Sequence, residues 1–210
     1  MSDILEKISL AIQEGEEDEV LEHVDEALGE GISAQKILDE GLLHGMGIVG
    51  ERFTSGDAFV PEVMSAADAL NGATAVLKEK FIEEGVTSTG KAVIATVNGD
   101  LHDIGKNLVK LMLEANGFEV FDLGTDVKQE SIVQAAKDNN ADIIALSALL
   151  TTTMAEMGNV VKAIEEAGIR DQVKILIGGS PITQGFADEI GADGTASNAA
   201  AAADLAKQLI

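Results

Sequence analysis

The sequence predicts a two-domain α/β protein, with an N-terminal four-helix bundle over residues 1–86 and a doubly wound, five-stranded parallel sheet over residues 87–210. Three observations predict it. Apolar residues recur at helical spacing from the N-terminus to about residue 82. From residue 91 onward, short apolar runs alternate five times with helical patterns, which is typical of buried parallel strands covered by helices. Between the two halves, residues 83–90 form a polar, glycine-containing segment that suits a linker.

The first half carries start and stop signals for each helix. Ser2 and Ser33 are candidate caps for the first and third helices, and Pro61 suits the first turn of the fourth. Gly29 and Gly31 are placed to end the second helix. Because the connections are short, the helices should pack as an antiparallel bundle. The apolar periodicity places them over about 4–12, 20–28, 33–49 and 61–77.

The second half is built from five strand–helix units. This alternation predicts a flavodoxin-like, Rossmann-like sheet with helices on both faces. The expected strands are 92–97, 118–122, 142–147, 173–177 and 193–196. The expected helices are about 104–116, 129–139, 155–167, 182–190 and 198–209.

Composition excludes several functions. The chain has 14 Lys and Arg against 37 Asp and Glu, a formal net charge of -23, so we expect no nucleic-acid partner and no anionic membrane surface. It has no cysteine, which excludes disulfides, thiolate zinc sites and Cys-ligated iron–sulfur clusters. No signal-peptide pattern and no bilayer-length apolar run is visible, and we therefore expect a cytoplasmic protein.

The segment 98–107, Asn-Gly-Asp-Leu-His-Asp-Ile-Gly-Lys-Asn, is the strongest indication of chemistry. It follows the first expected strand and precedes a helix, so Asp100 and His102 should lie where open α/β sheets bind ligands. A histidine with a carboxylate two residues away suits a metal ligand whose second ring nitrogen donates to that carboxylate. Gly99 and Gly105 flank the pair and allow a bulky ligand to approach the backbone.

The other loops at this sheet edge are rich in glycine and small hydroxyl residues. They are 124–126, 147–153, 178–180 and 196–198. Taken singly, each is best interpreted as a turn, and His102 alone would be a solvated loop histidine; the agreement between loops favours a large ligand. By itself, Asp103 reads as a helix cap or a solvent-facing residue, and Lys106 as a partner of acidic neighbours.

The remaining candidates have structural interpretations. His23 reads as part of a solvated helix face, His44 as a packed or capping residue, and Met46 and Met64 as core. The chain has no G-x-S-x-G, G-x-x-x-x-G-K-[ST] or H-E-x-x-H motif, and no G-x-G-x-x-G fingerprint follows an expected strand, so an autonomous enzyme is hard to assemble. One metal-type histidine beside a roomy edge suits a cofactor whose metal is already chelated.

Three motifs in order give the chain a family resemblance. Residues 100–105 fit D-x-H-x-x-G, 147–149 fit S-x-L, and 178–179 fit G-G. Over essentially its whole length the chain resembles cobalamin-binding corrinoid proteins. It is similar to the small corrinoid carrier subunits of methyl-transfer systems in methanogens and acetogens, and to the cobalamin module of methionine synthase.

The resemblance implies roles for particular residues. His102 would be the lower axial cobalt ligand, with Asp100 bonded to its other nitrogen and Thr153 bonded to Asp100. The helical half would cap the upper face, where Phe53 and Val60 shield the methyl group; Val60 stands where the methionine synthase module has Leu. The expected cofactor-binding residues are Asp100, His102, Asp103, Ile104, Gly105, Ser147, Leu149, Thr151, Thr153, Gly178, Gly179, Phe53 and Val60.

The resemblance also implies a non-autonomous methyl carrier. A substrate-specific methyltransferase would methylate its Co(I), a second methyltransferase would pass the methyl group from methyl-Co(III) to tetrahydrofolate or coenzyme M, and an iron–sulfur activator would rescue oxidised cobalt. The alternatives are a cobalamin-dependent sensor or regulator, an adenosylcobalamin mutase subunit, and a flavodoxin-like scaffold without cofactor. Regulators add a DNA-binding domain, and mutases lack the Phe53/Val60 cap. The methyl donor, the acceptor, the oligomeric state and the natural lower base stay open.

Overall fold

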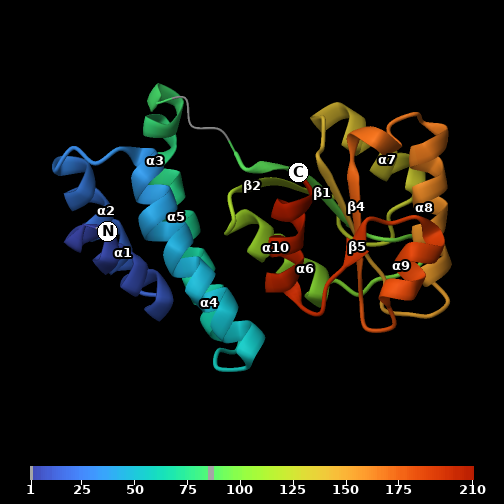
Figure 1. Cartoon of the computed structure of the whole chain (residues 1–210), viewed down its shortest axis with the longest axis horizontal. Helices are drawn as coiled ribbons and strands as arrows, with labels where there is room; N and C mark the ends of the chain where they lie inside the picture. The colour runs from blue at the N-terminus through green and yellow to red at the C-terminus, as the bar shows by residue number, and fades with distance from the viewer. Residues whose placement is uncertain (1, 85–87) are drawn as a thin grey trace. The chain divides into compact units, whose positions relative to one another are not determined.

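The computed structural model of the chain describes residues 2–84 and 88–210. It divides into a helical unit that ends at Ser88 and an α/β unit that begins at Thr89 (Figure 1). The expected domain boundary and the middle of the expected linker fall on residues 85–87, outside the described residues. No helix in the described ranges is long and apolar enough to cross a membrane.

The helical unit contains the four expected helical segments, and the third is unusual. Its first turn and its second half are α-helical, but the seven residues between them form a π-helix. Two glycines explain why this segment packs so closely on the first helix: a Cβ at Gly41 would lie 2.9 Å from Ile8 Cγ2, and one at Gly45 would lie 2.6 Å from the Ser9 carbonyl oxygen. The elements are α1 (Asp3–Glu14), α2 (Glu17–Gly29), α3 (Ala34–Lys36), η1 (Ile37–Leu43), α4 (His44–Ser55) and α5 (Val60–Glu84).

Most of the expected start signals act locally. Ser33 Oγ accepts a hydrogen bond from the Lys36 backbone N–H at 3.3 Å, and Pro61 is the second residue of α5. Ser2 occupies the N-cap position of α1, but its side chain makes no capping hydrogen bond. The core of the unit is aliphatic, and Met46 belongs to it as expected. The expectation for Met64 is wrong, because 50% of this residue is exposed on α5.

The α/β unit is a five-stranded parallel sheet with strand order β2-β1-β3-β4-β5, which confirms the predicted flavodoxin-like topology. Helices α6 and α10 lie on one face, and α7, α8 and α9 on the other (Figure 1). The elements are β1 (Gly90–Thr96), α6 (Ile104–Glu114), β2 (Phe118–Asp122), α7 (Gln129–Asn139), β3 (Ile143–Ser147), α8 (Met154–Glu166), η2 (Arg170–Gln172), β4 (Lys174–Gly178), α9 (Gln184–Ile190), β5 (Gly194–Thr195) and α10 (Ala199–Leu209).

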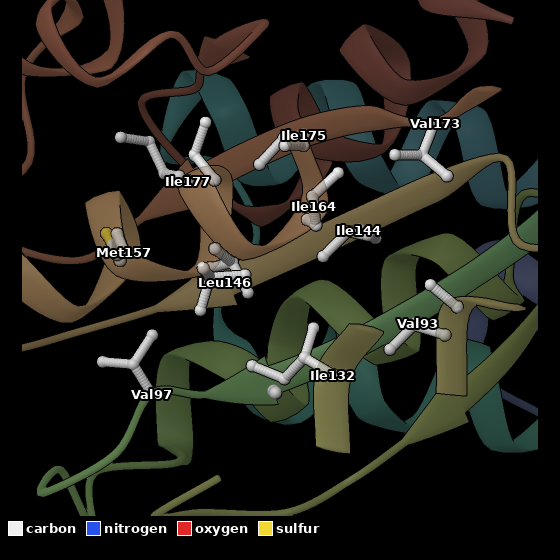
Figure 2. Close-up of a cluster of buried hydrophobic side chains, with 14 of the residues drawn as sticks. Val93, Val97, Ile132, Ile144, Leu146, Met157, Ile164, Val173, Ile175 and Ile177 are labelled. Atoms are coloured by element: carbon white, nitrogen blue, oxygen red, sulfur yellow. The ribbon is translucent and has the colours of Figure 1, made fainter. Parts of the chain in front are cut away.

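The sheet core is made of branched aliphatic residues. Figure 2 shows side chains from β1, β3 and β4, among them Val93, Ile144 and Ile175, packed with Ile132 of α7 and Ile164 of α8. These central strands are covered on both faces, so their sequences are nearly continuous apolar runs. This rigid layer fixes the directions in which the strand-end loops leave the sheet.

The strand order reverses between β1 and β3. The chain runs outward from β1 to β2, then returns past β1 to β3 and continues to β5. Crossovers therefore diverge at this point, and the loops after β1 and β3 splay to opposite faces, which leaves room for a ligand. The register pairs Thr96, the last residue of β1, with Ser147, the last residue of β3, so both loops begin at the same level.

Candidate functional site

Asp100 is the structural centre of the candidate site. Its side chain is fully buried on the β1–α6 loop, and five hydrogen bonds converge on its carboxylate. Oδ1 accepts from His102 Nδ1 at 2.7 Å and from the His102 backbone N–H at 3.1 Å. Oδ2 accepts from the Thr153 hydroxyl at 2.7 Å and from the backbone N–H groups of Leu149 and Leu150 at 2.8 and 3.3 Å. One buried carboxylate thus joins the loop after β1 to the loop after β3.

These bonds determine the charge of Asp100. Burial by itself raises the pKa of the carboxyl, but the bonds from the Thr153 hydroxyl, from the backbone and ring of His102, and from the Leu149 N–H outweigh it. The net result is a pKa well below the usual aspartate range, so Asp100 is ionised at neutral pH. An ionised carboxylate can only accept, so His102 carries a proton on Nδ1, and in the neutral imidazole the lone pair is then on Nε2.

The His102 ring is exposed although its anchor is buried. Its side chain is 52% accessible, and within the described residues Nε2 makes no hydrogen bond. The loop beneath it is fixed by further bonds: the Thr96 hydroxyl donates to the His102 carbonyl at 2.9 Å, and the Gly99 N–H donates to Asp126 Oδ1 at 2.7 Å. The ring is thus held with a lone pair directed away from its anchor, as a metal ligand requires.

Apolar side chains surround this histidine on the two joined loops. Leu101 and Ile104, on either side of it in sequence, are 72% and 79% exposed, and Leu149 and Leu150 are each 42% exposed. Large apolar residues at such exposure on one loop cluster mark a ligand-binding surface.

The loop after β4 supplies an open position beside this surface. Gly179 has φ +136°, and a Cβ on it would collide with the Ala148 carbonyl oxygen, so only glycine fits there. The Ala148 N–H donates to the Gly178 carbonyl at 3.1 Å, which keeps the two loops in contact. A Cβ at Gly178 would meet nothing within 4 Å. Gly179 therefore allows the loops after β3 and β4 to approach each other closely, and Gly178 leaves free space beside them.

The structure brings most of the predicted site residues together. Ser147 is half-buried at the end of β3, and Thr151 is exposed on the loop that Thr153 anchors. Asp103 precedes α6, and its carbonyl accepts from the Asn107 N–H at 2.8 Å, so its predicted position at the helix start is confirmed. Gly105 is exposed in the first turn of α6.

Phe53 and Val60 belong to the helical unit, which is described separately from the α/β unit. Phe53 is half-buried on α4, and Val60 is exposed at the start of α5. Beside Val60 the structure adds Phe59, 68% exposed, and the exposed Met64 one turn further on. The sequence analysis interpreted Met64 as core because of its helical spacing, and it assigned no role to Phe59. Phe59 in the loop before Pro61 was a usable signal.

The other polar candidates have partners close to them in their own units. His44 is exposed rather than packed, and its Nδ1 lies 3.0 Å from Ser9 Oγ. His23 is half-buried with Nδ1 3.7 Å from Glu26 Oε2. Lys106 does pair with an acidic neighbour, Asp122. Among the residues that the structure covers, no group of three or more His, Cys, Asp or Glu side chains could hold a metal ion.

The fold is a doubly wound parallel sheet, and the candidate site lies at its switch point, where such sheets bind ligands. The sequence matches two families, each described as a B12 binding domain, over residues 90–204 and 4–78. The chain therefore belongs to the B12-binding family, among the corrinoid proteins of methyltransferase systems. This membership confirms the predicted family and corrinoid cofactor, whereas cobalt ligation by His102 stays a prediction.

Relatives match over nearly the full length. The dimethylamine corrinoid protein of Methanosarcina barkeri is 44% identical over 210 residues, covering 99% of this chain and 98% of that protein. The crystal structure of a cobalamin-binding protein from Desulfitobacterium hafniense is 36% identical, with TM-score 0.85 and all of both chains covered. The methanol:cobalamin methyltransferase complex of Methanosarcina barkeri contains a chain that is 34% identical, with TM-score 0.86, covering 99% of this chain and 79% of that one.

Proposed function

We propose that this chain is a methyl carrier in which His102 binds the cobalt of a corrinoid from below. The observation that carries the proposal is the fully buried Asp100 carboxylate holding an exposed imidazole by Nδ1. The bound corrinoid supplies the cobalt atom that carries the methyl group. Asp100 holds the Nδ1 proton, so that Nε2 is the coordinating atom.

The Asp100–His102 pair also gives the carrier a proton site. Whenever His102 is not coordinated, Nε2 can take a proton while Asp100 still accepts from Nδ1. Thr153 and the two leucine amides hold Asp100 in place through this change. The relay Thr153–Asp100–His102 therefore links the charge of the imidazole to its bond with the metal.

The neighbouring surfaces bind the rest of the cofactor. Leu101, Ile104, Leu149 and Leu150 would cover the lower face of the corrin and exclude water from it, and their exposure supports this role. The free space at Gly178, beside the Gly179–Ala148 contact, suits the nucleotide tail. Ser147 and Thr151 lie on the same loop system and would contact that tail.

We propose that the helical unit covers the opposite face of the corrin with Phe53 and Val60. The B12-binding family match over residues 4–78, within this unit, supports that role. Such a cover protects a reactive methyl group from water and must move to admit a second protein.

Two methyltransferases would then act in turn on the carrier. The similarity to a dimethylamine corrinoid protein and to a chain of a methanol:cobalamin methyltransferase complex supports a substrate-specific methyltransferase as the first partner. The second would pass the methyl group to tetrahydrofolate or coenzyme M, and an iron–sulfur protein would reactivate oxidised cobalt. The chain is thus one subunit of a larger catalytic system.

The test compares His102→Ala with a matched control, His44→Ala, which removes an exposed histidine of the helical unit. Each protein is reconstituted with cobalamin, and the Co(II) form is examined by EPR after nitrogen-15 histidine labelling. We expect coupling to a protein nitrogen in the parent and the control, and none in His102→Ala. Coupling to the nucleotide base in the parent, or unchanged coupling in His102→Ala, would refute the assignment.

A further inference from the structure

Lys106 is a buried ammonium group close to the His102 loop. Its side chain is only 2% accessible, and its Nζ donates to both oxygens of Asp122, at 2.7 and 2.8 Å, and to Asn107 Oδ1 at 2.7 Å. Burying a charge is costly unless it is paired and hydrogen-bonded, and here all three ammonium protons have acceptors. Lys110, one turn along α6, also approaches Asp122, at 3.7 Å, but its side chain is 35% accessible.

The bonds of Lys106 extend to the residue that follows His102. The Asn107 amide accepts from Lys106 through Oδ1 and donates through Nδ2 to Asp103 Oδ2 at 3.2 Å. At the other end, Asp122 closes β2 and also accepts from the Gly124 N–H at 2.9 Å. A continuous chain, Asp122–Lys106–Asn107–Asp103, therefore runs from the end of an edge strand to the C-terminal side of His102.

The His102 loop thus has a separate anchor on each side. On its N-terminal side, Asp100 is bonded to the loop after β3. On its C-terminal side, the Lys106 chain is bonded to β2, on the opposite side of β1 in the sheet. The Thr96 hydroxyl on β1 holds the His102 carbonyl itself, at 2.9 Å, and the Lys106 chain adds a bond at the next residue, Asp103. Two anchors on two different strands fix both its position and its direction.

We propose that Lys106 is a positioning residue for the cobalt ligand, acting through Asn107 and Asp103 on the backbone of His102. This inference rests on the proposed function of His102. The competing interpretation is a purely structural ion pair that fastens α6 to β2. The two interpretations predict different effects of removing the ammonium group. Loss of a positioning residue increases the mobility of the His102 loop selectively, whereas loss of a structural ion pair lowers the stability of the whole α/β unit.

The decisive variant is Lys106→Met, which keeps a long apolar stem and removes the ammonium, with Lys110→Met as its matched control. The first measurement is amide hydrogen exchange of the corrinoid-free protein over residues 97–107. We expect exchange at His102 and Asn107 to rise about tenfold in Lys106→Met, the effect on local opening of losing a hydrogen bond from a charged donor. Lys110→Met should exchange like the parent.

The second measurement is the fraction of Co(II) corrinoid that shows histidine coupling by EPR. In Lys106→Met we expect the dissociation constant of the cobalt–histidine bond to rise about tenfold, with corrinoid still retained through the loops after β3 and β4. Parent-like loop exchange and coupling in Lys106→Met would overturn the proposal. So would exchange that rises evenly across the whole α/β unit.

If Lys106→Met does not fold, Asn107→Ala replaces it, because this change cuts the chain beyond the ion pair and leaves Lys106 on Asp122. Loop exchange and coupling in Asn107→Ala that match the parent would then overturn the proposal. If the parent shows no histidine coupling, the function proposed for His102 is refuted. The anchoring of the His102 loop by Lys106 is then tested by the exchange experiment on the corrinoid-free protein alone.

Discussion

Replacement of Asp100 by Asn is the sharpest perturbation of the site, because it keeps size and shape while removing one acceptor. The carboxylate receives two donors on Oδ1, both from His102, and three on Oδ2, from Leu149, Leu150 and Thr153. An amide has one oxygen and one NH2 group. Whichever way it turns, the NH2 group faces at least two former donors.

The expected loss of unfolding free energy follows from this count of hydrogen bonds. Two bonds to a charged acceptor are worth about 3–6 kcal/mol together, at about 1.5–3 kcal/mol each, against a typical domain stability of about 5–15 kcal/mol. The chain can recover part of the loss if the His102 ring moves its proton from Nδ1 to Nε2. That tautomer satisfies the new NH2 group but places a hydrogen on the nitrogen needed for cobalt. Asp100→Asn is thus expected to weaken both folding and coordination.

The stability difference between the parent and Asp100→Asn should also change with pH in a definite direction. Because the folded pKa of Asp100 is lowered, its stabilisation is complete above the unfolded value of about 3.9 and is lost as the pH falls toward the folded value. The difference in unfolding free energy between the parent and Asp100→Asn should therefore be largest near neutral pH. It should shrink as the pH falls below about 4.

The assay is urea unfolding of the corrinoid-free chain followed by circular dichroism, since the chain has no Trp or Tyr to serve as a fluorescence probe. Nitrogen-15 spectra of the imidazole report the tautomer. Asp204→Asn is the control, because this aspartate has a 65% exposed side chain and only a surface pair with Lys207. A variant that matches the parent in stability at pH 7 and keeps the proton on Nδ1 would show that Asp100 does not organise the site.

Three further changes test neighbouring parts of the site. Thr153→Val removes one of the three donors to Oδ2 and should cost about 1.5–3 kcal/mol of unfolding free energy, with the His102 tautomer unchanged in nitrogen-15 spectra. Gly179→Ala should destabilise the corrinoid-free protein by at least about 1–3 kcal/mol in urea unfolding, whereas Gly178→Ala should leave that stability unchanged and weaken corrinoid binding in a titration. Phe53→Ala should speed photolysis of the methylated cofactor and cost less than the about 3–5 kcal/mol of a fully buried ring, because Phe53 is half-buried; equal photolysis rates would place Phe53 away from the methyl group.

Periodicity predicted the architecture well because the sheet is covered on both faces. The apolar run expected over 118–122 is strand β2 with the same bounds, and the expected helix 129–139 is α7. The π-helical segment Ile37–Leu43 could not be foreseen, since it arises from close packing at Gly41 rather than from a local pattern. Met64 was wrongly assigned to the core because helical spacing alone cannot tell a buried face from an exposed one.

The contacts of the site also divide into those that the sequence predicted and those that it could not. The motif predicted that Asp100 and His102 lie together, because both are close in sequence on one loop. It could not predict that the backbone N–H groups of Leu149 and Leu150 donate to the same carboxylate, because almost every residue type has a backbone N–H. Lys106 was expected to pair with an acid, but its burial depends on the edge strand that lies beside it.

The register that aligns Thr96 with Ser147 has a consequence for biogenesis. During translation, the His102 loop is made well before its partners, and 179 − 102 = 77 residues separate it from Gly179, the last of the site glycines. At about 5–20 residues per second, this interval lasts about 4–15 s. Until Thr153 is made, the nascent loop lacks the three donors to Asp100 Oδ2, and until Gly179 is made it lacks the opening beside β4. Cofactor loading is therefore expected to follow synthesis of the whole sheet, and ribosome-bound chains that stop before Thr153 should not retain a corrinoid.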